Sequence, residues 1–110
     1  MAMDLDDKEA QAFWPLYRDY RIEMSKIGDR FVNMITTYAE NYPDMSDEVA
    51  GKLIKEYVSI EKARTRVREK YAGRFQKVLP VRKVMRFFQV DNRLDVAIAA
   101  ELGEQIPLVR

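Results

Sequence analysis

The sequence predicts an all-α protein built around a long helical hairpin. Apolar residues recur in unbroken 3,4 spacing over two stretches of about thirty residues, which is the period of an amphipathic helix. Only four Gly and four Pro occur among 110 residues, too few for an all-β chain with many turns. A chain of this length makes one domain, so we expect residues 1–110 to share a single helical core.

The first helix is expected over residues 6–42. Asp6, with Glu9 three residues later, predicts a capping box at its start. Pro15 removes a backbone hydrogen bond and crowds the preceding turn, so a kink near residues 13–15 is expected, giving a bent long helix or a short first helix. The apolar seam of this helix comprises Phe13, Tyr17, Tyr20, Met24, Ile27, Phe31, Met34 and Tyr38, widened by Leu16, Ile35 and Tyr42.

A linker over residues 41–46 contains Pro43, which ends the first helix. Ser46 or Asp47 is expected to cap a second helix over residues 47–78. Two arginines, Arg64 and Arg74, lie on the seam of this second helix, which the spacing predicts to be buried. Its seam comprises Ala50, Leu53, Tyr57, Ile60, Arg64, Val67, Tyr71, Arg74 and Val78.

A shorter final helix is expected over residues 81–102, beginning after Pro80, where a missing amide proton costs nothing. Gly103 is the expected C-cap, and residues 103–110 form a short tail. One face of this helix carries Val84, Phe87, Phe88, Leu94, Ile98 and Leu102.

The two long helices predict a homodimer. Each would extend about 45 Å at 1.5 Å per residue, so the monomer cannot be spherical. Two such hairpins would bury much more apolar surface by pairing.

Composition argues against an enzyme. The chain has no Cys and no His, which excludes a thiol nucleophile, a histidine base and almost any zinc, nickel or cobalt site. The close carboxylate pairs, Asp6/Asp7 and Asp44/Asp47, lie where helix capping accounts for them. No Gly-rich phosphate loop is present, and we expect no cofactor and no metal. No apolar run is long enough to span a bilayer, so no membrane insertion is expected.

The net charge of +1 conceals a strong asymmetry. Residues 1–48 carry five basic and eleven acidic side chains, a net of −6, whereas residues 49–93 carry thirteen and four, a net of +9. The basic stretch either offsets the acidic first helix within the hairpin or forms a cationic, aromatic surface for acidic or partly unfolded proteins. Nucleic acid is disfavoured, because no helix-turn-helix spacing is visible and the charges divide between two helix faces. The residues expected to face a client protein are Arg64, Arg68, Tyr71, Arg74 and Phe75.

The bend before the final helix resembles a known motif. Leu79-Pro80-Val81-Arg82-Lys83 is similar to the LTxxQ signature of the Spy/CpxP family of small periplasmic proteins, with Pro80 in the Thr position and Lys83 in the Gln position. A second degenerate copy is Leu5-Asp6-Asp7-Lys8-Glu9, with Asp6 and Glu9 in those two positions. The two copies open the first and last helices, and the order of elements also resembles that of the family.

The resemblance implies a cradle-like antiparallel dimer in the periplasm, acting as an ATP-independent chaperone or as an accessory in envelope-stress signalling. Metal-sensing relatives use His ligands, which this chain lacks. The acidic N-terminus has no signal segment, so we expect either a cytoplasmic protein or a mature form from which a signal was removed. The alternative function is a structural or adaptor hairpin that pairs with a partner helix and has no chaperone activity.

Overall fold

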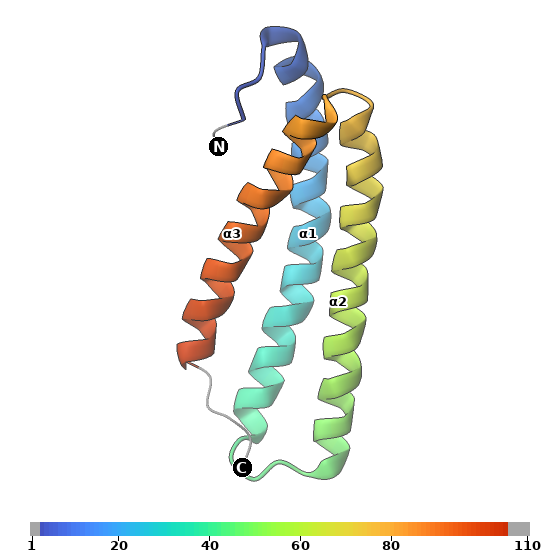
Figure 1. Ribbon diagram of the computed structural model, residues 1–110. Helices are drawn as coiled ribbons and strands as arrows, with labels where there is room; N and C mark the ends of the chain where they lie inside the picture. Colours follow the sequence, from blue (N-terminus) through green and yellow to red (C-terminus); the bar gives the residue numbers. More distant parts are fainter. Residues whose placement is uncertain (1–2, 106–110) are drawn as a thin grey trace.

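The protein consists of three helices, α1 (Asp7–Asn41), α2 (Asp47–Gln76) and α3 (Val81–Gln105). A computed structural model describes residues 3–105, excluding within α3 the side chains of residues 94, 95, 98, 99, 102 and 105. Leu94, Ile98 and Leu102 of the predicted third seam, and residues 106–110 of the predicted tail, therefore lie outside the described part. Helices α1 and α2 form an antiparallel hairpin, and α3 runs back beside α1 (Figure 1). The all-α hairpin prediction is confirmed.

Helix α1 begins with the predicted capping box. The Glu9 amide donates to the Asp6 carboxylate at 2.7 Å, and the Asp6 amide donates to the Glu9 carboxylate at 3.1 Å. Pro15 lies inside α1, so the prediction of a separate short first helix is wrong. Its missing hydrogen bond is accommodated within a helix of 35 residues that packs along most of its length. Figure 1 shows the first turns of α1 inclined to the rest of its axis.

The remaining helix ends are close to those predicted. Ser46 caps α2 by accepting from the Val49 amide at 3.2 Å. Helix α2 ends at Gln76, two residues before the predicted boundary, and the Pro80 carbonyl accepts the first backbone bonds of α3. The prediction that Gly103 is a C-cap is wrong, because α3 continues through it to Gln105.

The buried core lies at one end of the hairpin. Phe75 of α2 packs against Phe13 of α1 and Phe87 of α3, with ring centroids 5.3 and 4.7 Å apart, and Tyr20 packs edge-on against Phe87 at 5.5 Å. We call this part, residues 7–28, 60–76 and 81–91, the closed half. Its fully enclosed side chains are Phe13, Tyr20, Ile60, Tyr71, Phe75 and Phe87.

The opposite end of the hairpin has no buried side chain among the described residues. We call residues 29–59 the open half. Here Met34, Ile35 and Tyr38 of the predicted seam are only partly buried, and Tyr57 is 52% exposed. The placement of Tyr57 on a buried line was therefore wrong, because no described side chain of α3 beyond Asp91 is buried against this end.

Helix α3 explains the difference between the halves. It crosses the hairpin near its own start and diverges from α1 toward its C-terminal end (Figure 1). Asp91 is its last buried residue in the described part, and the described side chains beyond it are exposed. The molecule is elongated, with principal extents of 55 × 23 × 18 Å.

Candidate protein-binding site

Two of the five residues expected to face a client lie in the core. Phe75 is 0% exposed and Tyr71 is 1% exposed, so the prediction that they lie on the protein surface is wrong. At the closed half, Phe75 packs against Phe13 of α1 and Phe87 of α3, whereas Tyr71 packs against Tyr20 of α1 and against Phe75. Aromatic side chains bury the largest apolar area available, so a three-helix contact recruits them.

Tyr71 anchors a polar cluster between α1 and α2. Its hydroxyl donates to the Glu23 carboxylate at 2.5 Å, and Lys70 donates to the same carboxylate at 2.9 Å. The Tyr71 hydrogen bond, followed by that from Lys70, lowers the pKa of Glu23. Burial, together with the Glu23 carboxylate, raises the pKa of Tyr71 to about 12. Arg74, which is exposed, lies over the Tyr71 ring at 5.0 Å.

The other two arginines are partly buried on the α1 side of α2. Arg64 bonds to Glu61 at 2.8 Å, and its guanidinium lies 5.2 Å from the centre of the Phe31 ring. Arg68 is half-buried and lies close enough to Tyr20 to favour the ionised form of that phenol. Both arginines therefore contact residues of the protein itself, and neither is fully exposed for contact with a client.

A buried carboxylate that the sequence analysis missed joins the helices. Asp91 of α3 is 6% exposed, accepts a hydrogen bond from the Tyr20 hydroxyl at 2.7 Å and lies 3.8 Å from Arg21. Burial, followed by the Asp91 hydrogen bond, raises the pKa of Tyr20. Asp91 follows Val84 and Phe87 in 3,4 spacing, so a single acidic residue in an apolar row was the signal that could have found it.

The residues of the two degenerate motifs meet at the closed end. Lys83 donates to the Glu9 carboxylate at 2.5 Å, so the two residues in the Gln positions form an ion pair between α1 and α3. Leu79 is buried, and Leu5 packs against the same core. The motif residues therefore fasten the ends of the hairpin and of α3 together, in keeping with their predicted helix-capping role.

An apolar groove occupies the open half, with a volume of about 460 Å³. It lies between α1 and α2 and reaches the connection between them. Its lining comprises Met34, Ile35, Tyr38, Met45, Ala50, Leu53, Ile54 and Tyr57. We call it the tip groove.

The tip groove continues the hairpin face that α3 covers in the closed half. On α2, Ala50, Tyr57, Arg64 and Tyr71 are seven residues apart and so share a helix face. Tyr71 belongs to the ring cluster shared with α3, whereas Ala50 and Tyr57 line the groove. The same apolar seam is thus a buried core at one end of the molecule and, among the described residues, a partly exposed groove at the other.

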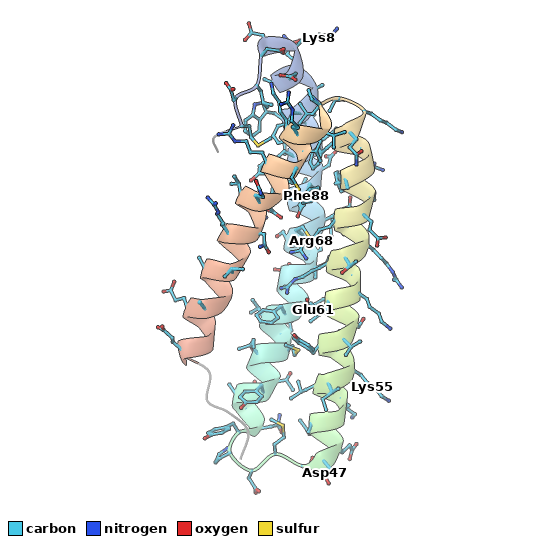
Figure 2. All side chains as sticks on the ribbon, in the orientation of Figure 1. Lys8, Asp47, Lys55, Glu61, Arg68 and Phe88 are labelled. Carbon is cyan, nitrogen blue, oxygen red and sulfur yellow. The ribbon has the colours of Figure 1, made fainter. Side chains whose placement is uncertain are left out.

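A second apolar and cationic surface lies on the side of α2 away from α1, where Figure 2 shows Lys55 pointing outward. Ile54 and Val58 are 65% and 43% exposed and line shallow hollows there together with Lys55, Lys62 and Arg66. In the described part of the chain, these three cations have no ion-pair partner. We call this surface the α2 outer face.

The charge asymmetry has a partly structural origin. Glu23 pairs with Lys70, and Glu9 pairs with Lys83, so acids of α1 meet bases of α2 and α3. Arg30 of α1 pairs in the opposite sense with Glu56 of α2 and bonds to Ser59 at 2.8 Å. Part of the basic stretch therefore neutralises acidic residues of α1. The cations of the α2 outer face form no ion pair in the described part of the chain.

Within the described residues, no cluster of three or more Asp or Glu side chains is placed to hold a metal ion. None of the helices, over their described residues, combines the length and hydrophobicity that crossing a membrane requires.

No protein-family model matches the chain, and neither a curated protein nor a solved structure matches it. The site is therefore interpreted from its own geometry and from the sequence resemblance.

Proposed function

We propose that this protein is a non-enzymatic protein-binding module that holds apolar segments of other polypeptides at its open half. The observation that carries the proposal is the tip groove, an apolar seam over residues 29–59 in which no side chain is buried among the described residues. Exposed apolar surface rimmed by charge is typical of protein-interaction sites. The mode of action we propose is that of the Spy/CpxP-like proteins: an ATP-independent chaperone or envelope-stress accessory of the periplasm.

The client surface in this proposal differs from the one that the sequence predicts. Tyr71 and Phe75 belong to the core, so client contacts pass to the groove residues Leu53 and Tyr57 and to the α2 outer face. The cations Lys62 and Arg66 on that face supply attraction for acidic clients without requiring the closed half to open. Binding of this kind needs no cofactor.

A light-scattering assay tests the chaperone activity. The protein should suppress aggregation of a heat-unfolded client at near-stoichiometric amounts, and less strongly at high salt, because the outer-face charges are screened. The variant Ile54→Ser/Tyr57→Ser should lose most of the suppression. The variant Val81→Ser/Ile22→Ser matches it in exposure, at 66% and 52% against 65% and 52%, and should retain the suppression. Equal suppression by both double variants would contradict the proposal.

A second candidate is the adaptor hairpin that pairs with one partner helix and has no chaperone activity. The row of groove residues in 3,4 spacing favours it, because that spacing is complementary to a helix. Failure to suppress aggregation of any client, combined with tight binding of one helical segment, would favour the adaptor over the chaperone.

We also propose that the protein forms a homodimer through the α2 outer face when no client occupies that face. Ile54 and Val58 form its apolar centre, Asp47 lies toward one end, and Lys62 and Arg66 lie toward the other. An antiparallel second copy sets Asp47 of each protomer near Arg66 of the other, whereas a parallel copy sets like charges together. Sedimentation should show a dimer that Val58→Glu converts to a monomer, and a monomeric wild type would contradict this part of the proposal.

A further inference from the structure

We propose that the tip groove binds a basic amphipathic helix of a partner protein, seated where a third helix would complete the bundle. This inference rests on the proposed protein-binding function and names the chemistry of the segment that is bound. It concerns the groove between α1 and α2, not the cationic α2 outer face.

The groove occupies a third-helix position that α3 cannot fill. Two contacts fix the position of α3 along α1: Lys83 with Glu9, and Asp91 with Tyr20. The contacting residues are separated in the sequence by 74 positions in the first pair and by 71 in the second. Even laid straight along α1, the last residue of α3, Gln105, would reach only the level of residues 31–34. Helix α3 would therefore not reach the level of Tyr38 and Met45, at the outer end of the groove.

The shape of the lining suits a helix. Along α1, Met34, Ile35 and Tyr38 recur at helical spacing, as do Leu53 and Tyr57 on α2. Two neighbouring antiparallel helices presenting such rows form a trough into which the apolar face of a third helix packs. Met34 and Met45 add flexible side chains that adapt to different apolar partners.

Charge selects a basic segment. The end of the hairpin, residues 39–50, contains four acidic side chains and no basic one. Glu48 pairs with Lys52 along α2, while the other three have no ion-pair partner in the described part of the chain. We call these four residues the acidic tip: Glu40, Asp44, Asp47 and Glu48. A helix N-terminus carries a partial positive charge, so the acidic tip attracts both the basic side chains and the N-terminal end of the incoming helix.

The same charge disfavours the chain's own α3 as the occupant. Its last turns carry the exposed residues Glu101 and Glu104, and its last turn has no basic side chain. The C-terminal end of a helix also carries a partial negative charge. Closing α3 toward the acidic tip would therefore bring like charges together.

Two synthetic peptides test the proposal. Each is a helix of about 14 residues, or about 21 Å, with Leu at the same i, i+3, i+4 and i+7 positions. One carries Lys at its polar positions and the other carries Glu. Fluorescence anisotropy of the labelled peptides against the full chain should show the Lys peptide binding at least tenfold more tightly than the Glu peptide, with a difference that shrinks at high salt.

Matched variants locate the binding. Ile54→Ser/Tyr57→Ser should weaken the Lys peptide at least tenfold, because both residues line the groove. Val81→Ser/Ile22→Ser should leave it unchanged, and so should Val58→Ser, because Val58 lines the α2 outer face and not the groove. Asp44→Asn/Asp47→Asn should remove most of the preference for Lys over Glu. Circular dichroism on each variant confirms that the helices are retained.

Three results would overturn the proposal: equal or tighter binding of the Glu peptide, loss of binding in the Val81→Ser/Ile22→Ser control, or a groove already filled by the chain itself. A groove filled by the chain itself would be detected with a variant that ends at Gln105. This variant would then bind the Lys peptide more than tenfold more tightly than the full chain does. If a second copy of the chain occupied the groove, the affinity for the Lys peptide would fall as the protein concentration rises and the protein dimerises. Suppression of client aggregation without any Lys preference would overturn this inference and leave the proposed function standing.

Discussion

The closed and open halves share one hairpin and one apolar pattern but differ in what covers them. In the closed half, residues on α1 and α2 meet α3 and form a core in which Phe13, Phe75 and Phe87 are 0% exposed. In the open half, residues in the same 3,4 register line a groove. The difference shows that helical spacing specifies which face of a helix is apolar, whereas the length and direction of the neighbouring helix decide whether that face is buried.

The polar contacts follow the same division. Asp91, Tyr20, Glu23 and Tyr71 form hydrogen bonds in the closed half, where low solvent access makes such bonds strong. The open half carries the exposed carboxylates of the acidic tip. We therefore expect the closed half to supply stability and the open half to supply binding.

The largest expected effect comes from an aromatic truncation in the closed half. Phe75→Ala should lower the free energy of unfolding by about 3–5 kcal/mol, because it opens a cavity beside the rings of Phe13 and Phe87. Tyr57→Ala in the open half should cost less than about 1 kcal/mol, because half of that side chain is already exposed. Urea denaturation of both variants measures the contrast, and similar losses would contradict the division into halves.

The next largest effect is expected at the buried carboxylate. Asp91→Ala leaves the Tyr20 hydroxyl without its acceptor and should cost about 3 kcal/mol. A control, Asp44→Ala, removes an exposed carboxylate and should change stability by less than about 0.5 kcal/mol. Equal effects of the two substitutions, measured by thermal denaturation, would show that Asp91 does not join the helices.

Alkaline pH should weaken the closed half. Folding raises the pKa of Tyr71 from 10.0 to about 12, so its contribution is fully present below pH 10 and is lost as the pH rises toward 12. Tyr71→Phe should reduce the steepness of this loss without abolishing it, because the pKa of Tyr20 is also raised. A pH series of unfolding free energies checks this, and an unchanged profile in Tyr71→Phe would contradict the assignment.

Acid pH should also lower the free energy of unfolding, but by less than alkaline pH does. The hydrogen bond from Tyr71 lowers the pKa of Glu23 below its ordinary value of 4.5, so its contribution is present above pH 4.5 and is lost as the pH falls through the lowered pKa. Glu23→Gln should flatten that part of the pH profile. A profile as steep as that of the wild type would contradict this role of Glu23.

The smallest stability effect is expected in the tip groove. Ile54→Ser should change the free energy of unfolding by less than about 0.5 kcal/mol, because the side chain is 65% exposed. A loss above about 2 kcal/mol in urea denaturation would mean that the groove is part of the folding core. The comparison with binding is informative because the same substitution contributes to the expected loss of peptide affinity.

The fold could be predicted from local signals to within a few residues at most helix ends. The Asp6–Glu9 capping box, the Ser46 cap and the start of α3 after Pro80 are set by local backbone chemistry that the sequence displays. The choice at Pro15 between a bent long helix and a short first helix could not be made in this way, since packing along a long helix outweighs the local cost.

The candidate site was less predictable. Periodicity marked Tyr57 and Tyr71 as equivalent, yet Tyr71 is 1% exposed among the rings of the closed half and Tyr57 is 52% exposed in the groove. The direction in which α3 leaves Pro80 is a tertiary property that periodicity does not contain. The basic stretch likewise indicated a binding surface on α2, whereas Asp44 and Asp47 of the acidic tip were assigned only to helix capping.

The central claim is that one half of the molecule holds the fold and the other half binds. Hydrogen exchange with and without the Lys peptide tests it most directly. We predict that amides of residues 60–76 are already protected and change little, while amides of residues 29–59 exchange faster in the free protein and become protected with the peptide. Protection gained in the closed half, with none in residues 29–59, would contradict the account.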